Sequence, residues 1–339
     1  VIEDPLEPVL GNDGEWITEG ARTVILRERE GLEKERLMEH RRDYPLDEYD
    51  MFAFATGSCE FNEANFIAQI ESLETNPVLL RKVRLIEEQK VTKGLYPGQK
   101  DIIERSVKWM DDENGNWLLF EEPREKNKFE FYNGVVIPKN TLEYCAGVDT
   151  FRIGFAEDGS QGAICVFDRK KKYPVAMYTG RTRLIQHLYD EIIKVCLLYG
   201  CKVNIEISAG DHFYGYFHQH NCIDLLYWTP ALDPHKRNPV LKPGTESASP
   251  YELAAQLEAA KIFFDGDNPH EYNGNVHNVV FLPLLRQGLN YTHAERTPYD
   301  LMISLMMALL PALHVSTSHV PVELKPKQLM QTYKIEKYA

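Results

Sequence analysis

The order of strand and helix patterns after residue 141 restricts what this chain can fold into. Apolar runs separated by polar turns predict three successive antiparallel strands, and alternating helix and strand patterns follow them. Strands are expected at residues 144–148, 163–167, 175–179, 203–207 and 223–227, with helices at 182–199 and 211–220. Three antiparallel strands followed by parallel ones predict an α/β fold, with a mixed sheet and helices on both faces.

This order matches the RNase H-like architecture, and further helices are expected after the sheet. One begins with Ser249 as N-cap and Glu252 three residues later, which is the pattern of a capping box. Another begins near Thr297 and Pro298. Its apolar stretch 301–313 falls short of the roughly 20 residues that span a bilayer, so we expect a buried helix and no membrane contact.

Three carboxylates stand at the edges of apolar elements, where loss of hydration is costly unless something compensates it. Asp149 and Glu206 end the first and fourth predicted strands, and Asp300 lies about three residues into the last helix. If those strands are parallel neighbours, their acids meet at one edge of the sheet, and a helix N-terminus favours an anion at Asp300. A pair of divalent cations held by oxygen ligands would compensate all three acids and would suit phosphodiester hydrolysis.

Each acid also has a simpler interpretation when it is taken alone. Asp300 could be a first-turn partner of the helix dipole, and Asp149 could be a turn residue at the end of a strand. Asp158 is a further candidate ligand in the turn after the first strand, and a plain hairpin turn explains it equally well.

At these residues the chain resembles the nuclease domain of viral terminase large subunits, the motors that package double-stranded DNA in tailed bacteriophages. Segments 146–149, 203–206 and 297–305 are similar to the three acidic motifs of that family, in the same order. Segment 41–52 is similar to the stretch that joins the ATPase of the family to its nuclease. Tyr299 departs from the pattern, because the family often has a second acid there.

The resemblance implies a metal-dependent endonuclease that cuts concatemeric double-stranded DNA. Asp149, Glu206 and Asp300 would be its catalytic residues and hold two Mg²⁺ or Mn²⁺ ions, with Asp158 as an additional candidate ligand. The implied partners are DNA, the portal and procapsid, and the small terminase subunit. The implied location is the host cell cytoplasm. No Walker sequence occurs in the chain, so the ATPase core is expected to be missing from it.

The predicted organisation has three parts. Residues 1–140 are expected to form a smaller α+β accessory region that follows the missing ATPase core. Residues 141–315 form the nuclease, and the Lys-rich tail 316–339 is mobile or bound by a partner. Within the accessory region, helices are expected at 21–42 and 63–73, and strands at 83–89, 105–110, 117–121 and 129–132. Whether this region packs on the nuclease is left open.

Charge and composition keep two other functions open. The net charge of −13 argues against broad coating of nucleic acid, although a local basic surface such as 169–172 would suffice. The six cysteines form no C-x-x-C pair, so a zinc site is not expected. One alternative is another RNase H-like nuclease of the resolvase or transposase type. The other is a non-catalytic docking module with structural acids, which fits the acidic charge.

Overall fold

The computed structural model describes much of the chain. The described residues are 9–10, 16–17, 20–29, 32, 40, 44, 46, 59–92, 102–124, 128–132, 134–151, 161–182, 184–207, 212–230, 241–246, 249–266, 274–293, 296 and 298–314. The strands are β1 (Val9–Leu10), β2 (Trp16–Ile17), β3 (Arg81–Thr92), β4 (Ile102–Asp111), β5 (Trp117–Leu119), β6 (Phe129–Tyr132), β7 (Val135–Pro138), β8 (Tyr144–Asp149), β9 (Gly162–Asp168), β10 (Tyr173–Gly180), β11 (Lys202–Ile207), β12 (Trp228–Pro230), β13 (Leu241–Pro243) and β14 (Thr245–Glu246). The helices are α1 (Ala21–Arg29), α4 (Glu63–Thr75), α5 (Ile185–Tyr199), α6 (Phe213–Gln219), α7 (Pro250–Asp265), α8 (Leu282–Asn290) and α9 (Asp300–His314), with short 3₁₀ turns η1 (Ile223–Leu225) and η2 (Val276–Asn278).

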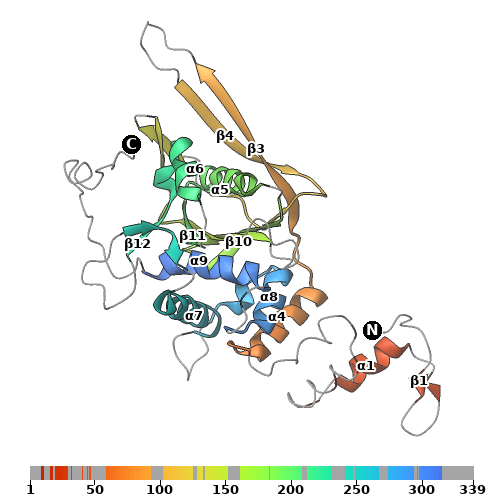
Figure 1. The fold of residues 1–339 in the computed structure, drawn as a ribbon. Helices are drawn as coiled ribbons and strands as arrows, with labels where there is room; N and C mark the ends of the chain where they lie inside the picture. The colour runs from red at the N-terminus through yellow and green to blue at the C-terminus, as the bar shows by residue number, and fades with distance from the viewer. Residues whose placement is uncertain are drawn as a thin grey trace, which may run out of the picture.

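One mixed sheet organises the described part of the chain (Figure 1). Its strands lie in the order β14-β11-β8-β9-β10-β5-β3-β4. Strands β8, β9 and β10 pair antiparallel, while β11 lies parallel to β8 and β14 lies parallel to β11. This is the strand arrangement of the RNase H-like fold, so the predicted fold class is confirmed.

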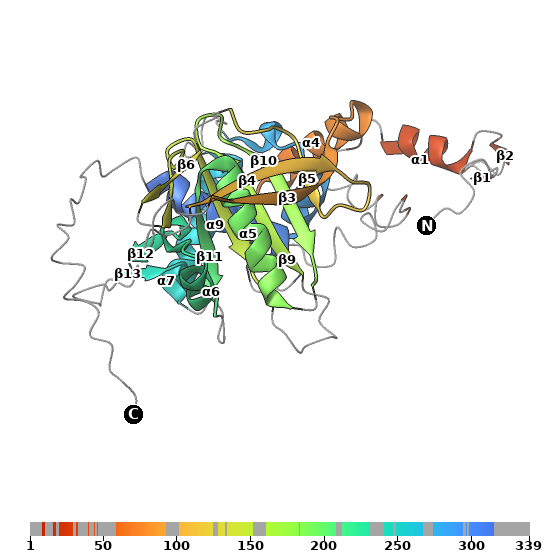
Figure 2. The ribbon, with the colours of Figure 1, turned by 90° about the horizontal axis from the view of Figure 1, so that it is seen from above.

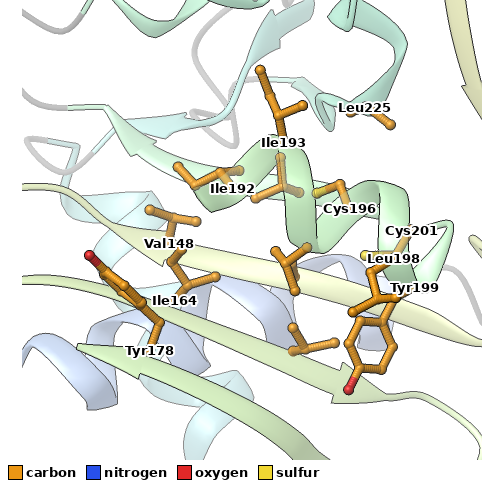
Figure 3. Close-up of a cluster of buried hydrophobic side chains, with 14 of the residues drawn as sticks. Val148, Ile164, Tyr178, Ile192, Ile193, Cys196, Leu198, Tyr199, Cys201 and Leu225 are labelled. Carbon is orange, nitrogen blue, oxygen red and sulfur yellow. The ribbon is translucent and has the colours of Figure 1, made fainter. Parts of the chain in front are cut away.

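Helices cover both faces of the sheet. Helix α5 packs on one face and α9 on the other, with α7, α8 and α4 outside α9 (Figure 1 and Figure 2). Figure 3 shows Ile192 of α5 above Val148 and Ile164 of the sheet, within one cluster of buried side chains. Because both faces are covered, every residue of β8 is buried, and its sequence is a continuous apolar run rather than an alternating one.

Helix α9 lies very close to β8 because residue 147 is glycine. A Cβ atom built on Gly147 would lie 2.1 Å from the carbonyl oxygen of Ser304 and 2.2 Å from the backbone nitrogen of Ala308. The thiol of Cys145 donates a hydrogen bond to the carbonyl of Ala308 at 3.2 Å. The helix therefore runs antiparallel to β8, with residue 308 above 145 and residue 304 above 147.

Strands β3, β4 and β5, which lie in the predicted accessory region, extend this same sheet. Strand β5 pairs with β10, and β3 pairs with β5 and β4. The long β3–β4 hairpin projects past the body (Figure 1). These strands therefore pack on the nuclease sheet, which the sequence left open. The domain boundary at residue 140 stays a prediction, and the tail 316–339 lies outside the described residues.

The strand predicted at 223–227 is wrong. Residues 223–225 form the 3₁₀ turn η1, and Leu226 makes only an isolated parallel bridge to Val203. The N–H of Leu226 bonds the carbonyl of Ile223, and the N–H of Tyr227 bonds the carbonyl of Val203 in β11 at 2.8 Å, so pairing with β11 is limited to this single bridge. Strand β14 instead pairs in parallel with β11 and serves as the fifth strand that had been expected at 223–227. A short buried apolar run cannot be assigned to strand or turn from its periodicity alone.

Other elements differ in detail from prediction. The capping box is not formed, because Ser249 makes no side-chain cap bond and Glu252 is buried instead. Strand β7 and helix α8 were not predicted, and α1 ends at Arg29, with most of 30–42 outside the described residues. No helix in the described part of the chain is long and apolar enough to cross a membrane.

Candidate active site

Asp149 and Glu206 lie side by side at the C-terminal ends of β8 and β11. The parallel register pairs Val148 with Ile205, so the next residue on each strand is one of the two acids. Both acids are on the sheet face that α9 covers, because Asn204, two positions before Glu206, donates its side-chain N–H to a backbone carbonyl of α9 at 2.9 Å. The two residues are 6% and 8% exposed, so the carboxyl pair is almost fully buried.

Asp300 reaches the same edge of the sheet from α9. It is the first residue of the helix, rather than about three residues inside it as predicted. Ser304 lies above Gly147, and side chains four apart on a helix and two apart on a strand repeat on one face, so the same alignment carries Asp300 over Asp149. The Oδ2 atom of Asp300 accepts a hydrogen bond from the backbone N–H of Gln161 at 3.0 Å, just before β9.

The three acids interact electrostatically. Burial raises the pKa of Asp149 well above its usual range, and the negative charges of Glu206 and Asp300 raise that pKa further. A hydrogen bond with Glu206 acts in the same direction, and the positive charge of Arg296 opposes it. The structure thus brings together the three carboxylates that the sequence singled out. Their catalytic role stays a prediction.

Arg296 faces this acidic cluster and was not identified from the sequence. Its Nη2 atom donates to Oε1 of Glu206 at 3.0 Å and to Oε1 of Gln256 at 2.7 Å. The side chains of Arg296 and Glu206 are 16% and 10% exposed, so this ion pair is largely shielded from water. A basic residue four positions before a helix-opening acid is a weak sequence signal, and nothing in the sequence links it to Glu206.

Helix α7 places two buried polar side chains behind the site. Glu252 is 5% exposed and Gln256 is 1% exposed, and their spacing of four puts them on one side of the helix. Among the described residues, no protein group pairs with Oε2 of Glu252, Nε2 of Gln256 or Nε of Arg296. Buried polar atoms without partners are costly, so this arrangement leaves hydrogen-bonding capacity beside Glu206.

Other predicted features lie elsewhere. Asp158 lies outside the described residues. The basic segment 169–172 forms the β9–β10 turn, at the end of the sheet opposite Asp149. Asp168 closes that turn: it accepts hydrogen bonds from the N–H groups of Lys170 and Lys171, both at 2.9 Å. This turn therefore contributes no positive charge next to the carboxylates.

The carboxylates fit a divalent cation in their chemistry. Mg²⁺ and Mn²⁺ prefer oxygen ligands, and this edge of the sheet offers three carboxyl groups. In their present arrangement, however, no three acidic, histidine or cysteine side chains among the described residues form a ready set for a metal ion. One carboxyl oxygen of Glu206 is instead bonded to Arg296.

Comparisons with known proteins give structural likenesses only. No family model and no curated protein matches the sequence. The fold is similar to the large terminase nuclease from thermophilic phage G20c, solved with bound zinc and with bound magnesium, each at 13% identity and a TM-score of 0.37, covering 58% of this chain and 88% of that chain. The Thermus phage P74-26 large terminase nuclease domain matches at 13% identity and a TM-score of 0.36, covering 58% and 86%. Likenesses this distant do not decide function.

Proposed function

We propose that this chain is a divalent-metal-dependent endonuclease that hydrolyses phosphodiester bonds in double-stranded DNA. The observation that supports it is the meeting of Asp149, Glu206 and Asp300 at one edge of the sheet. Two of these acids come from adjacent parallel strands and the third from the first residue of α9. The negative charges of Glu206 and Asp300 raise the pKa of Asp149, and a divalent cation is the partner that compensates such a cluster best.

In this proposal, Asp149, Glu206 and Asp300 hold two Mg²⁺ or Mn²⁺ ions, and Asp158 is an additional candidate ligand. The bound ions supply Lewis-acid activation and stabilise the charge that develops at phosphorus. The chain itself provides the orientation. Strands β8 and β11 fix Asp149 and Glu206 through their shared register, and the N–H of Gln161 holds the carboxylate of Asp300.

We further propose a role in viral genome packaging, which rests on the resemblance of the three acidic segments to terminase large subunits. The substrate would be concatemeric DNA, cut at the start and end of packaging in the host cell cytoplasm. The portal, the procapsid and the small terminase subunit would be its partners, and an ATPase core on another segment would drive translocation.

A plasmid-nicking assay in Mn²⁺ tests the proposal. The variants Asp149→Asn, Glu206→Gln and Asp300→Asn should each lose activity by about 100-fold or more, since even partners that only orient metal ligands contribute about 10- to 100-fold. Asp111→Asn is the matched control, because this exposed acid at the end of β4 pairs with Arg81 and should cut at the wild-type rate. Wild-type cutting by both Asp149→Asn and Asp300→Asn would refute the assignment.

One observation favours a second candidate, the non-catalytic docking module. The ion pair between Arg296 and Glu206 compensates one acid without any metal. That function predicts no nicking in Mn²⁺ or Mg²⁺ by the folded wild-type chain.

A strong preference for four-way junctions over linear duplex would instead indicate a nuclease of the resolvase type.

A further inference from the structure

We infer that Arg296 is a positioning residue that competes with divalent cations for Glu206. When a cation displaces Arg296 from Glu206, Gln256 keeps the guanidinium of Arg296 bonded. The inference rests on the proposed metal site and adds a switch between two partners of one carboxylate. Three observations carry it: a shared nitrogen, the burial of the ion pair, and a spare acceptor on α7.

The first observation is that a single nitrogen of Arg296 serves both partners. Nη2 lies 3.0 Å from Oε1 of Glu206 and 2.7 Å from Oε1 of Gln256. A guanidinium NH₂ group carries two hydrogens, so one can be donated to each oxygen at the same time. Arg296 therefore has an anchor on α7 that does not depend on the carboxylate.

The second observation is that the ion pair between Arg296 and Glu206 is largely buried. The side chains of Arg296 and Glu206 are 16% and 10% exposed, which strengthens the attraction between them and any repulsion between two cations. A divalent ion on Oε1 of Glu206 would lie within a few ångströms of the guanidinium. An ion that binds Glu206 through Oε1 therefore requires Arg296 to leave that oxygen.

The third observation is what remains for Arg296 after it leaves. The amide oxygen of Gln256 stays bonded, and Nε of Arg296 has no partner among the described residues. Glu252, one turn away on the same side of α7, offers a buried Oε2 atom that no described group pairs with. Helix α7 can thus hold the guanidinium of Arg296 outside the carboxylate cluster, where the positive charge still has hydrogen-bond acceptors.

Substitutions of Arg296 and Gln256 should have opposite effects on metal affinity. Arg296→Gln removes the competitor and its charge, so Mn²⁺ should bind about 5- to 10-fold more tightly. Gln256→Leu changes no charge, but it removes the anchor that keeps the displaced guanidinium bonded. Mn²⁺ should then bind about 5- to 10-fold more weakly, because displacement leaves a buried charged donor unpaired.

The experiment measures the Kd for Mn²⁺ by electron paramagnetic resonance of the free ion, on the whole chain without DNA. Circular dichroism confirms that each variant is folded. Arg286→Gln is the matched control, because it removes an arginine of α8 that pairs with Glu74 at 3.1 Å, away from the carboxylates. This control should bind Mn²⁺ like the wild type.

The possible outcomes separate the inference from the function on which it rests. Wild-type protein that binds no Mn²⁺, or binds it equally well as Asp149→Asn, overturns both. Binding that depends on Asp149 but is unchanged in Arg296→Gln and Gln256→Leu overturns the competition alone. Weaker binding by Arg296→Gln also overturns it, because Arg296 would then support the metal site. Should Arg296→Gln not fold, a wild-type Kd in Gln256→Leu is sufficient to reject the inference.

Discussion

Gly147 sets the distance between α9 and the sheet, and with it the height of Asp300 above Asp149. Backbone atoms of the helix lie where a side chain at residue 147 would begin. The hydrogen bond from Cys145 to the carbonyl of Ala308 holds the helix at that distance. A residue without chemistry of its own thereby controls the geometry of the carboxylates.

Replacing Gly147 with alanine should destabilise the fold by about 3 kcal/mol or more, because the new methyl group overlaps backbone atoms that cannot rotate away. Urea denaturation followed by circular dichroism measures the change. The matched control is Gly215→Ala in α6, where a Cβ atom meets nothing within 4 Å. That variant should be neutral or more stable by up to about 1 kcal/mol, since alanine favours helices. Equal stabilities for the two variants would contradict the close contact.

The three acids could be found from the sequence because each ends or opens an apolar element, and desolvation makes such positions unusual. Arg296 and Gln256 could not. Arg296 bonds an acid 90 positions away and an amide 40 positions away, and sequence spacing carries no record of such contacts. The start of the last helix was also predicted about three residues too early, since the first helical residue depends on local backbone geometry.

Arg105 adds a charged contact between the β3–β4 hairpin and the body, beyond the pairing of β3 with β5. Arg105 donates to Oε2 of Glu87 across the hairpin at 3.1 Å and to the thiol of Cys222, just before η1, at 3.2 Å. The side chains of Arg105 and Glu87 are 10% and 14% exposed. The pair therefore joins the far strands of the sheet to the segment that follows α6.

This pair gives the stability a pH dependence. Burial raises the pKa of Glu87, but the hydrogen bond and charge of Arg105 outweigh it, so the folded pKa lies below the ordinary 4.5. Stabilisation is then fully present above about pH 4.5 and is lost as pH falls through the lowered folded pKa. Glu87→Gln should cost about 1–3 kcal/mol at pH 7 and progressively less below pH 4, measured by urea denaturation. Glu88→Gln on the exposed side of the hairpin should show no such dependence; a parallel loss in both variants would reject the argument.

Strand and helix positions were predicted well where periodicity was clear and the elements were long. β8, β9, β10, β11 and α5 all formed where expected. The exceptions are short elements. The two-residue strand β14 owes its place to pairing with β11 and to Thr245, whose hydroxyl donates to the buried amide oxygen of Asn204 at 3.0 Å. Such contacts are tertiary, so local sequence does not encode them.

For the whole molecule, the proposed metal binding would be linked to folding. An ion that binds only the folded state raises its stability by about 2.7 kcal/mol when present at 100 times its Kd. Adding Mn²⁺ should therefore raise the Tm of the wild type, and should not raise that of Asp149→Asn or Asp300→Asn. Differential scanning fluorimetry measures this. No shift in the wild type would favour the docking module, and an equal shift in all three proteins would place the metal elsewhere.

Helix α9 supplies the cover of one sheet face and the third acid together. It packs on β8, β9 and β11, strands that precede it by more than ninety residues in the chain. On the ribosome, the nascent protein can pair those strands but leaves their apolar face bare until residues 300–314 emerge. The proposed metal site therefore cannot be complete while only the sheet has been made; packing of this one helix finishes the hydrophobic core and brings in the third acid of that site in the same step.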